Sequence, residues 1–321
     1  MAIQNPTTAP AGEGTLTGFL TDENAPNKIA KTALSILYKD LVLGRLVNRD
    51  YQNEFIPGVG ASITVPISAV TSAKIKTGAD DHETDIEYEG LTEDFVNIVI
   101  DKDIYHGAGI GHATNTLTLK KFTSQVLQPQ AAAVAEQVEH VLAEQFNARP
   151  DNEAVRADTI LRVVTKMGTQ LTKANVPLAG RVLLVGAEVA EELVSIKELT
   201  EFDKSASTGA LRDAVIGRLR GFTVVQSNSI ADKEMHALTR DAIAYVTRPM
   251  AAPMGAKSSG TASHKGFGLR WVLDYAPGKV RDLSLVQQFA GVKTLDEKRI
   301  VSASLDTVGP APTTSVTAKK K

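Results

Sequence analysis

Two glycines, Gly58 and Gly60, lie close to an apolar run and are the first residues in this chain that could do chemistry. A dinucleotide-binding fingerprint needs a third glycine, and it needs a following helix whose N-terminus holds the pyrophosphate. Here the third glycine is missing and residues 61–70 alternate as a strand does, while a Walker loop would need Lys followed by Ser or Thr. Gly58 and Gly60 are therefore predicted to form a hinge into a strand.

Eight acidic residues, with no Lys or Arg among them, fall within residues 80–94, which we call the acidic segment. Clustered carboxylates could hold calcium, but "DDHETDIEYEGLTED" lacks the Asp-x-Asp-x-Asp-Gly register of a tight calcium loop. The pattern favours a solvated or partner-facing stretch, with a loose surface cation site as the alternative.

The remaining polar residues form no catalytic or metal-binding constellation. The six histidines show no His-x-x-x-His or His-Glu-x-x-His spacing, and no serine lies in a Gly-x-Ser-x-Gly elbow. Glu188, Glu191 and Glu192 lie in the first turns of a predicted helix, where carboxylates complement the helix dipole. We expect no enzyme activity, no cofactor and no metal.

The composition is that of an ordinary globular protein of one or two domains. The chain has 321 residues, 43% hydrophobic and 22% charged, and a net charge of −2, so it carries no basic field for nucleic acid. It contains no cysteine, which excludes disulfides and thiolate chemistry. Because no apolar run approaches the roughly 18 residues of a membrane span and the N-terminus is unlike a secretion signal, a cytoplasmic location is expected.

The N-terminal third is predicted to be extended. Residues 1–28 have the composition of an arm, and a short helix follows Pro26 and runs to about Gly44. Alternating residues 61–70 and 95–106 predict two strands of a long hairpin, the first of them an edge strand because Pro66 cannot donate a ladder hydrogen bond.

The rest of the chain is predicted to contain a long helix, a mixed lobe and a closing pair of strands. Apolar spacing predicts a helix over about 118–148, roughly 45 Å long at 1.5 Å per residue, in which Pro129 either kinks the helix or lies at N1 of its main segment. A mixed α+β lobe follows, with helices at 158–174 and from Ala187, a short helix after residue 209, and strands at 181–185, 222–227 and 241–248. A linker over 250–266 leads to two long strands that turn at Pro277-Gly278.

An arm and a projecting hairpin are poorly suited to a monomer, because they leave unpaired strand edges exposed. Both suit contacts with neighbouring copies, which symmetry then repeats around a closed assembly. The sequence resembles tailed-phage major capsid proteins of the HK97 fold, more specifically the P22-coat-like family. The segments that carry the resemblance are "GRLVNRDYQNEFIPGVGASITVPI", "DIEYEGLTEDFVNIVIDKDIYHGAGI", "AAAVAEQVEHVLAEQF", "PLAGRVLLVGAEVAEELVS" and "IGRLRGFTVVQSNSI".

The resemblance implies an α+β fold with a definite order of parts. These are an N-terminal arm and helix (1–46), an E-loop hairpin and its base (47–106), a P-domain with the spine helix (107–154), an A-domain (155–255), closing P-domain strands (256–308) and a flexible tail (309–321). It implies hexamers and pentamers of an icosahedral head, assembled in the host cytoplasm, around double-stranded DNA that is contacted non-specifically. A separate scaffolding protein and a portal are implied, decoration proteins are optional, and no membrane is involved. An encapsulin-type compartment and, more distantly, a hydrolase with an unrecognised acid pair are the alternatives.

The same resemblance directs attention to subunit contacts. Lys74 and Lys76 stand where some relatives form a covalent cross-link, although non-covalent locking is expected here. We expect the acidic segment to dock on a basic surface of the adjacent subunit. The interface candidates are the acids Asp80, Asp81, Glu83 and Asp85 and the bases Arg45, Arg49, Lys120, Lys121, Arg270, Lys279 and Arg281.

Overall fold

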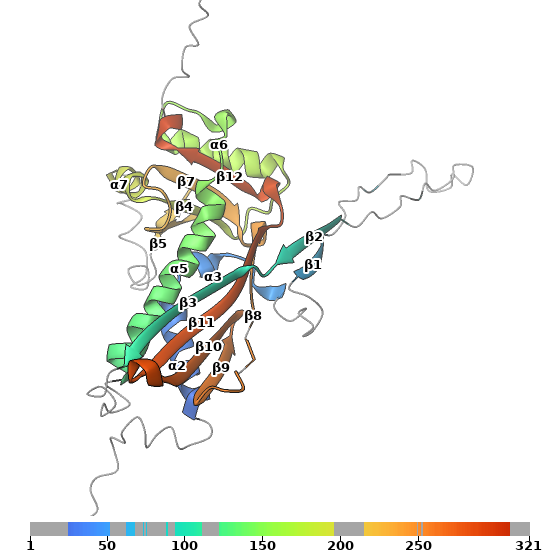
Figure 1. Cartoon of the computed structure of the whole chain (residues 1–321). Coiled ribbons are helices and arrows are strands. Elements are labelled where there is room, and N and C mark those ends of the chain that lie inside the picture. The colour runs from blue at the N-terminus through green and yellow to red at the C-terminus, as the bar shows by residue number, and fades with distance from the viewer. Residues whose placement is uncertain are drawn as a thin grey trace, which may run out of the picture.

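The structure is a computed structural model that describes residues 25–51, 62–67, 94–110, 122–195, 215–248 and 253–308, with single positions 73, 75, 88, 250 and 251. Two packed bodies of secondary structure share one long helix, and a two-stranded ribbon projects from the side of the molecule (Figure 1). Residues 1–24 of the predicted arm, the glycine hinge and the tail lie outside the described residues.

The lower body is built on an antiparallel sheet. Its strands, in spatial order, are β3 (Lys102–Ile110), β11 (Arg281–Thr294), β10 (Phe267–Ala276) and β9 (Ser258–His264), and β8 (Ile243–Arg248) pairs with the end of β11. The predicted pair of long closing strands is confirmed as β10 and β11, which pair in register with Trp271 opposite Val286. They turn through the short helix η8 (Pro277–Lys279), as predicted from Pro277-Gly278.

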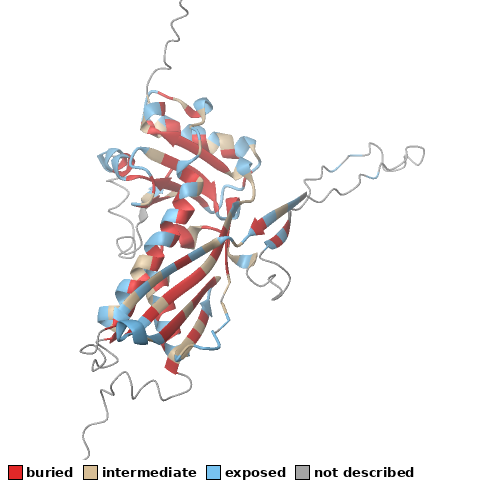
Figure 2. Ribbon diagram, viewed as in Figure 1, coloured by how far each residue is buried: buried red, intermediate tan, exposed pale blue. Residues whose placement is uncertain are grey.

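Helices cover one face of this sheet. They are α2 (Ala25–Asp40), the single turn α3 (Leu43–Leu46) and α5 (Gln128–Asn147). The core between them contains the largest buried side chains, including Trp271, whose ring meets that of Phe122 edge to face at 6.3 Å between centroids. Figure 2 shows buried residues along the helices and strands of this body and exposed ones along its outer surfaces. One continuous core therefore fills the lower body, and it extends into the other body as far as Leu184 and Leu238.

The predicted spine helix is present. Phe122 already has helical backbone, a π-type turn η3 (Thr123–Leu127) follows, and α5 continues to Asn147. Pro129 is the second residue of α5, directly after the π-type turn, so the predicted position at the start of the main helical segment is confirmed to within one residue. Residues 118–121 of the predicted helix lie outside the described residues.

The upper body is a five-stranded mixed sheet with two helices. Its strands, in spatial order, are β12 (Ile300–Ser304), β7 (Glu234–Thr239), β4 (Arg181–Val185), β6 (Phe222–Gln226) and β5 (Val215–Leu219). Its helices are α6 (Ile160–Lys173) and α7 (Ala187–Ser195), both near the predicted positions. Only the pair β4 and β6 is parallel. The described residues also form short 3-10 turns: η4 (Glu153–Val155), η7 (Arg240–Ala242), η9 (Glu297–Arg299) and η10 (Leu305–Thr307).

The projecting ribbon consists of β1 (Ser62–Ile67) and β2 (Asp94–Val99), an antiparallel pair in a sheet of its own. The predicted hairpin base and the edge position of the strand that holds Pro66 are both confirmed. The single second strand predicted over 95–106 is wrong, because it breaks at Ile100 and Asp101. At this break the chain changes its pairing partner, from β1 in the ribbon to β11 in the lower sheet. The alternation of exposed and less exposed side chains continues across the break.

Other predicted elements need correction. The helix predicted to run to Gly44 ends at Asp40 and resumes as α3, and it starts at Ala25, inside the predicted arm. The predicted linker over 250–266 contains strand β9, and a strand, β5, occupies the described part of the segment predicted to hold a short helix. Strands β7 and β12 were missed, and β8 belongs to the lower sheet and not to the α+β lobe. The division of the chain into the six predicted regions remains a prediction.

Candidate subunit-interface surfaces

The described residues hold no group of three or more His, Cys, Asp or Glu side chains that could bind a metal ion. The arrangement closest to a catalytic one is around His236, whose Nδ1 lies 2.9 Å from Ser302 Oγ and whose Nε2 lies 3.2 Å from Glu234 Oε2. The imidazole is only 1% exposed and packs against the ring of Phe146, so no substrate reaches it. This cluster is a buried polar contact between β7 and β12.

No helix within the described ranges combines the length and the apolar character needed to cross a lipid bilayer.

The ribbon is fixed to the body by one of its faces. Ile63, Val65 and Ile98 are buried against Ala244 and Val246 of β8. Strand β11 also approaches the end of β2 closely, because a Cβ on Gly291 would lie 2.4 Å from the carbonyl oxygen of Val99. Only a glycine permits this approach, so the position of the ribbon base is fixed by backbone contact as well as by apolar packing.

The opposite face of the ribbon carries exposed apolar side chains. Phe95 is 60% exposed and Val99 is 50% exposed, although both belong to the same strand as the buried Ile98. A two-stranded sheet has two free edges, and a ribbon this small is not stable by itself. Among the residues that the structure describes, the ribbon therefore offers an apolar face and unpaired strand edges to a partner.

Several predicted interface residues lie outside the described residues. They are the acids Asp80, Asp81, Glu83 and Asp85, the lysines Lys74, Lys76, Lys120 and Lys121, and the hinge glycines Gly58 and Gly60. Their roles stay predictions.

Arg270, a predicted interface base, is engaged within its own subunit. Its Nη1 donates to the carbonyl oxygen of Ala251 at 2.7 Å, and its Nη2 donates to the side-chain oxygen of Gln287. Gln287 in turn donates to both carboxylate oxygens of Asp103 at 2.7 Å. The three side chains form a cross-strand network over β10, β11 and β3, which leaves Arg270 little freedom to meet an incoming carboxylate.

The other described candidates differ in their surroundings. Arg281 is exposed at the start of β11 and lies over Gly109 of β3, where a Cβ would come within 3.0 Å of its guanidinium. Lys279 is exposed in the η8 turn. Arg45 is half-buried beside Glu139, whose carboxyl pKa it acts to lower through its charge.

Arg49 has the most distinctive environment of the predicted bases. Its guanidinium carbon lies 5.0 Å from the ring centroid of Phe267 and 5.9 Å from that of Tyr38, in range for cation–π contact. Its Nε and Nη1 are shielded from solvent and donate no hydrogen bond to any described residue. Arg49 also packs against the β9–β10 turn, since a Cβ on Gly266 would lie 2.6 Å from Arg49 Cβ.

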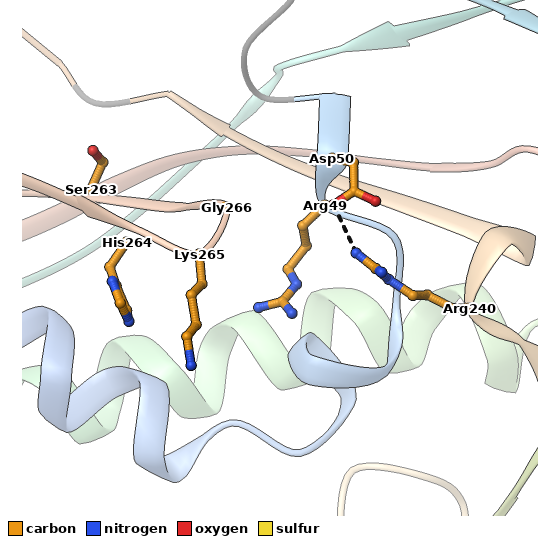
Figure 3. Close-up of a pocket in the computed structure, with 7 residues that line it drawn as sticks. All are labelled: Arg49, Asp50, Arg240, Ser263, His264, Lys265 and Gly266. Atoms are coloured by element: carbon orange, nitrogen blue, oxygen red, sulfur yellow. Dashed lines mark hydrogen bonds and ion pairs between the residues drawn. The ribbon is translucent and has the colours of Figure 1, made fainter. Parts of the chain in front are cut away.

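Residues that the sequence did not single out complete a pocket around Arg49 (Figure 3). The pocket has a volume of about 710 Å³, and we call it the cationic pocket; it is lined by Arg49, Asp50, Arg240, Ser263, His264, Lys265 and Gly266. Lys265 and Gly266 form a two-residue turn with positive φ angles of 49° and 82°, the conformation of tight hairpin turns. This turn directs Lys265 to the same aromatic ring as Arg49, with Nζ 5.0 Å from the Tyr38 centroid.

The charges of the cationic pocket are unbalanced. Its lining has three permanent cations and one carboxylate, and that carboxylate, Asp50, already pairs with Arg240 at 2.8 Å. A second groove of about 410 Å³ adjoins the pocket at Ser263 and His264 and adds two lysines, Lys31 and Lys39 of α2. The sequence contained one signal for this pocket, the Lys265-Gly266 pair, which is typical of a tight hairpin turn. This pair lay inside the segment that was interpreted as a linker.

The fold is that of a phage capsid subunit. A structure from Mycobacterium phage Che8 superposes with a TM-score of 0.55 at 21% sequence identity, covering 82% of this chain and 90% of that chain. The capsid of Ralstonia phage GP4 gives a TM-score of 0.53 at 11% identity, covering 77% and 84%. The spine helix, the projecting ribbon and the two bodies are thus the parts of an HK97-like fold.

Sequence comparison identifies the family. Residues 113–287, more than half of the chain, match the model of a family described as phage capsid protein. The chain belongs to this phage capsid protein family, and it is a structural protein of the phage head. No curated protein matches the sequence.

Proposed function

We propose that this chain is the major capsid protein of a tailed phage and that it assembles into hexamers and pentamers of an icosahedral shell enclosing double-stranded DNA. The observation that carries the proposal is the projecting ribbon, which has free edges and an exposed apolar face in a chain of the phage capsid family. Such a feature gains stability only when a neighbouring copy covers it, and a closed symmetric shell provides that neighbour to every subunit.

In this proposal, the contact between subunits is partly electrostatic. The acidic segment of one copy docks on a basic surface of the next. Individual exposed ion pairs contribute only about 0–1 kcal/mol, so the pairs set register and partner choice more than strength. Replacing Asp80, Asp81, Glu83 and Asp85 by the corresponding amides should impair assembly while the subunit stays folded, and normal particles from that variant would contradict the docking model.

The proposal also includes partners other than the chain itself. A separate scaffolding protein would guide curvature, a portal would occupy one vertex, and the shell would contact packaged DNA without sequence preference, with decoration proteins as an optional addition. The net charge of −2 fits a shell that holds DNA loosely and does not bind it tightly.

Electron microscopy of the purified protein tests the proposal directly. The protein should be imaged alone and after co-expression with a candidate scaffolding protein from the same phage. Closed shells with hexameric and pentameric capsomers are expected in at least one of these preparations. Monomers under all conditions would contradict shell assembly, and shells that contain a protein cargo and no nucleic acid after expression in the native host would point to a compartment.

A further inference from the structure

We propose that the cationic pocket is the receptor for the acidic segment of a second copy of this chain. This inference rests on the proposed shell assembly and selects one surface among the predicted basic candidates. The groups that enter the pocket are side-chain carboxylates of Asp or Glu residues in the acidic segment.

Two cations in the pocket converge without a counter-charge. Arg49 and Lys265 both lie over the ring of Tyr38, and no carboxylate of the described chain pairs with either of them. Their mutual repulsion is unfavourable until an anion arrives between them. The ring holds both cations at the pocket wall by cation–π contact, so the site is formed before the anion binds.

Arg49 also has unused donors. Its Nε and Nη1 are removed from water without any hydrogen-bond acceptor in the described chain, although almost all buried polar groups in folded proteins are paired. A guanidinium meets a carboxylate through two parallel N–H groups, either Nε with Nη2 or Nη1 with Nη2, so each arrangement would use one of these two unpaired donors. An incoming Asp or Glu would therefore balance the positive charge and pair one of the two donors.

The alternative basic surfaces are less suitable. Arg270 already donates to Ala251 and Gln287, and Arg281 stands in an open turn region with Lys279, where no pocket wall shields the pair from solvent. An exposed pair is weaker because water screens it. The cationic pocket alone among the described candidates combines shielding, aromatic support and an excess of positive charge.

The acidic segment is the matching occupant in this chain. It has eight carboxylates and no Lys or Arg within residues 80–94, while the chain as a whole is slightly acidic. The ribbon that carries its C-terminal end, Asp94, projects away from the body (Figure 1), which favours contact with another copy. A phosphate of the packaged nucleic acid is the competing occupant, and the experiments below distinguish it from a carboxylate.

The absence of cysteine from the chain allows a clean cross-linking test. Ser263→Cys places a thiol in the pocket wall and Thr84→Cys places one within the acidic segment, and neither change alters a charge. Particles co-assembled from the two single variants should form covalent dimers on mild oxidation, while particles of either variant alone should not. Gly278→Cys, beside Lys279, is the matched control, and its pairing with Thr84→Cys should give no dimer.

A charge variant provides the second readout. Arg49→Gln combined with Lys265→Gln should reduce particle yield at least tenfold, whereas Lys279→Gln with Arg281→Gln should not change it, and the fluorescence of Trp271 should show that both variants are folded. Wild-type yield from the pocket variant, or dimers through position 278 in place of 263, would overturn the inference. Normal shells that lose only DNA retention would assign the pocket to phosphate and overturn it too. If the wild-type protein forms no shells at all, it is the proposed function that fails.

Discussion

The carboxylate of Glu139 accepts a hydrogen bond from the backbone N–H of Leu43 at 2.8 Å, and it accepts two more, from Val42 and Gly44, at 3.0 Å each. Glu139 lies on the spine helix and is almost completely buried. One side chain thus satisfies the free N–H groups at the start of α3 and ties the N-terminal helices to the spine.

Glu139→Gln should therefore destabilise the subunit. The amide keeps the size of the side chain but replaces one acceptor oxygen by a donor that faces an N–H group, which leaves at least one buried donor unpaired. A loss of about 1–3 kcal/mol in the free energy of unfolding is expected, measured by denaturant unfolding of the wild type and the variant. Replacement of the exposed Glu136, one turn earlier, by Gln is the control and should have little effect.

The Glu139 carboxyl should also give the subunit a pH-dependent stability. Burial raises its pKa above the ordinary value, while the three backbone N–H groups and Arg45 act in the opposite direction. Because the folded state then holds the proton more tightly than the unfolded state, this contribution to stability is complete below the ordinary carboxyl pKa and is lost as the pH rises through the raised one. The stability difference between wild type and Glu139→Gln should shrink over that window, and a difference that grows with pH would contradict this assignment.

Gly291→Ala should loosen the ribbon. The added Cβ would lie 2.4 Å from the Val99 carbonyl oxygen, so either β11 or the end of β2 must shift, and overpacking of this kind costs about 1–3 kcal/mol. Faster hydrogen exchange at the amides of β1 and β2 is the expected result. Gly278→Ala, where a Cβ meets nothing within 4 Å, is the control and should leave the exchange unchanged.

The sequence predicted the parts of this fold that have strong local signals. Apolar spacing and turn chemistry predict the spine helix, α6, the strand 181–185 and the turn at Pro277-Gly278. These are local patterns, so a single sequence was enough to predict these elements. The strand Ser258–His264 was missed, because its Ser, Gly, Thr and Ala residues resemble a linker. Its strand conformation depends on pairing with β10 and on the first turn of α2, whose Pro26 carbonyl lies where a Cβ of Gly260 would be.

The candidate site was predictable only in part, for a related reason. Arg49 was identified as a basic residue beside the helix, but its partners in the pocket come from two distant segments, the η7 turn with Arg240 and the β9–β10 turn with Lys265. Neither segment has a motif that indicates a shared site, since the tertiary packing of Arg49 on Gly266 brings them together. Conversely, Arg270 looked free in the sequence and is occupied in the structure, because strand register sets Gln287 opposite it.

Ser284→Ala should weaken the attachment of the spine helix to the lower sheet. Ser284 Oγ accepts from the indole Nε1 of Trp271 at 3.0 Å and donates to the side-chain oxygen of Gln130 at 2.9 Å, all three side chains being buried. Its removal leaves a donor and an acceptor unpaired, with an expected loss of about 1–3 kcal/mol. Trp271 is the single tryptophan of the chain, so its fluorescence spectrum should shift as well, and an unchanged spectrum and stability would contradict the network.

The two faces of strand β2 should respond differently to the same kind of change. Phe95→Ser on the exposed face removes little intramolecular packing, because the Phe95 residue is 60% exposed, so the stability of the isolated subunit should change by less than about 0.5 kcal/mol. Ile98→Ser on the buried face removes contacts with β8 and exposes a hydroxyl to an apolar site, so it should destabilise the subunit by about 2–5 kcal/mol. If the exposed face meets a neighbouring copy, Phe95→Ser should nonetheless reduce the yield of assembled particles, as measured by sedimentation. Equal particle yields from Phe95→Ser and wild type would show that this face stays open in the shell.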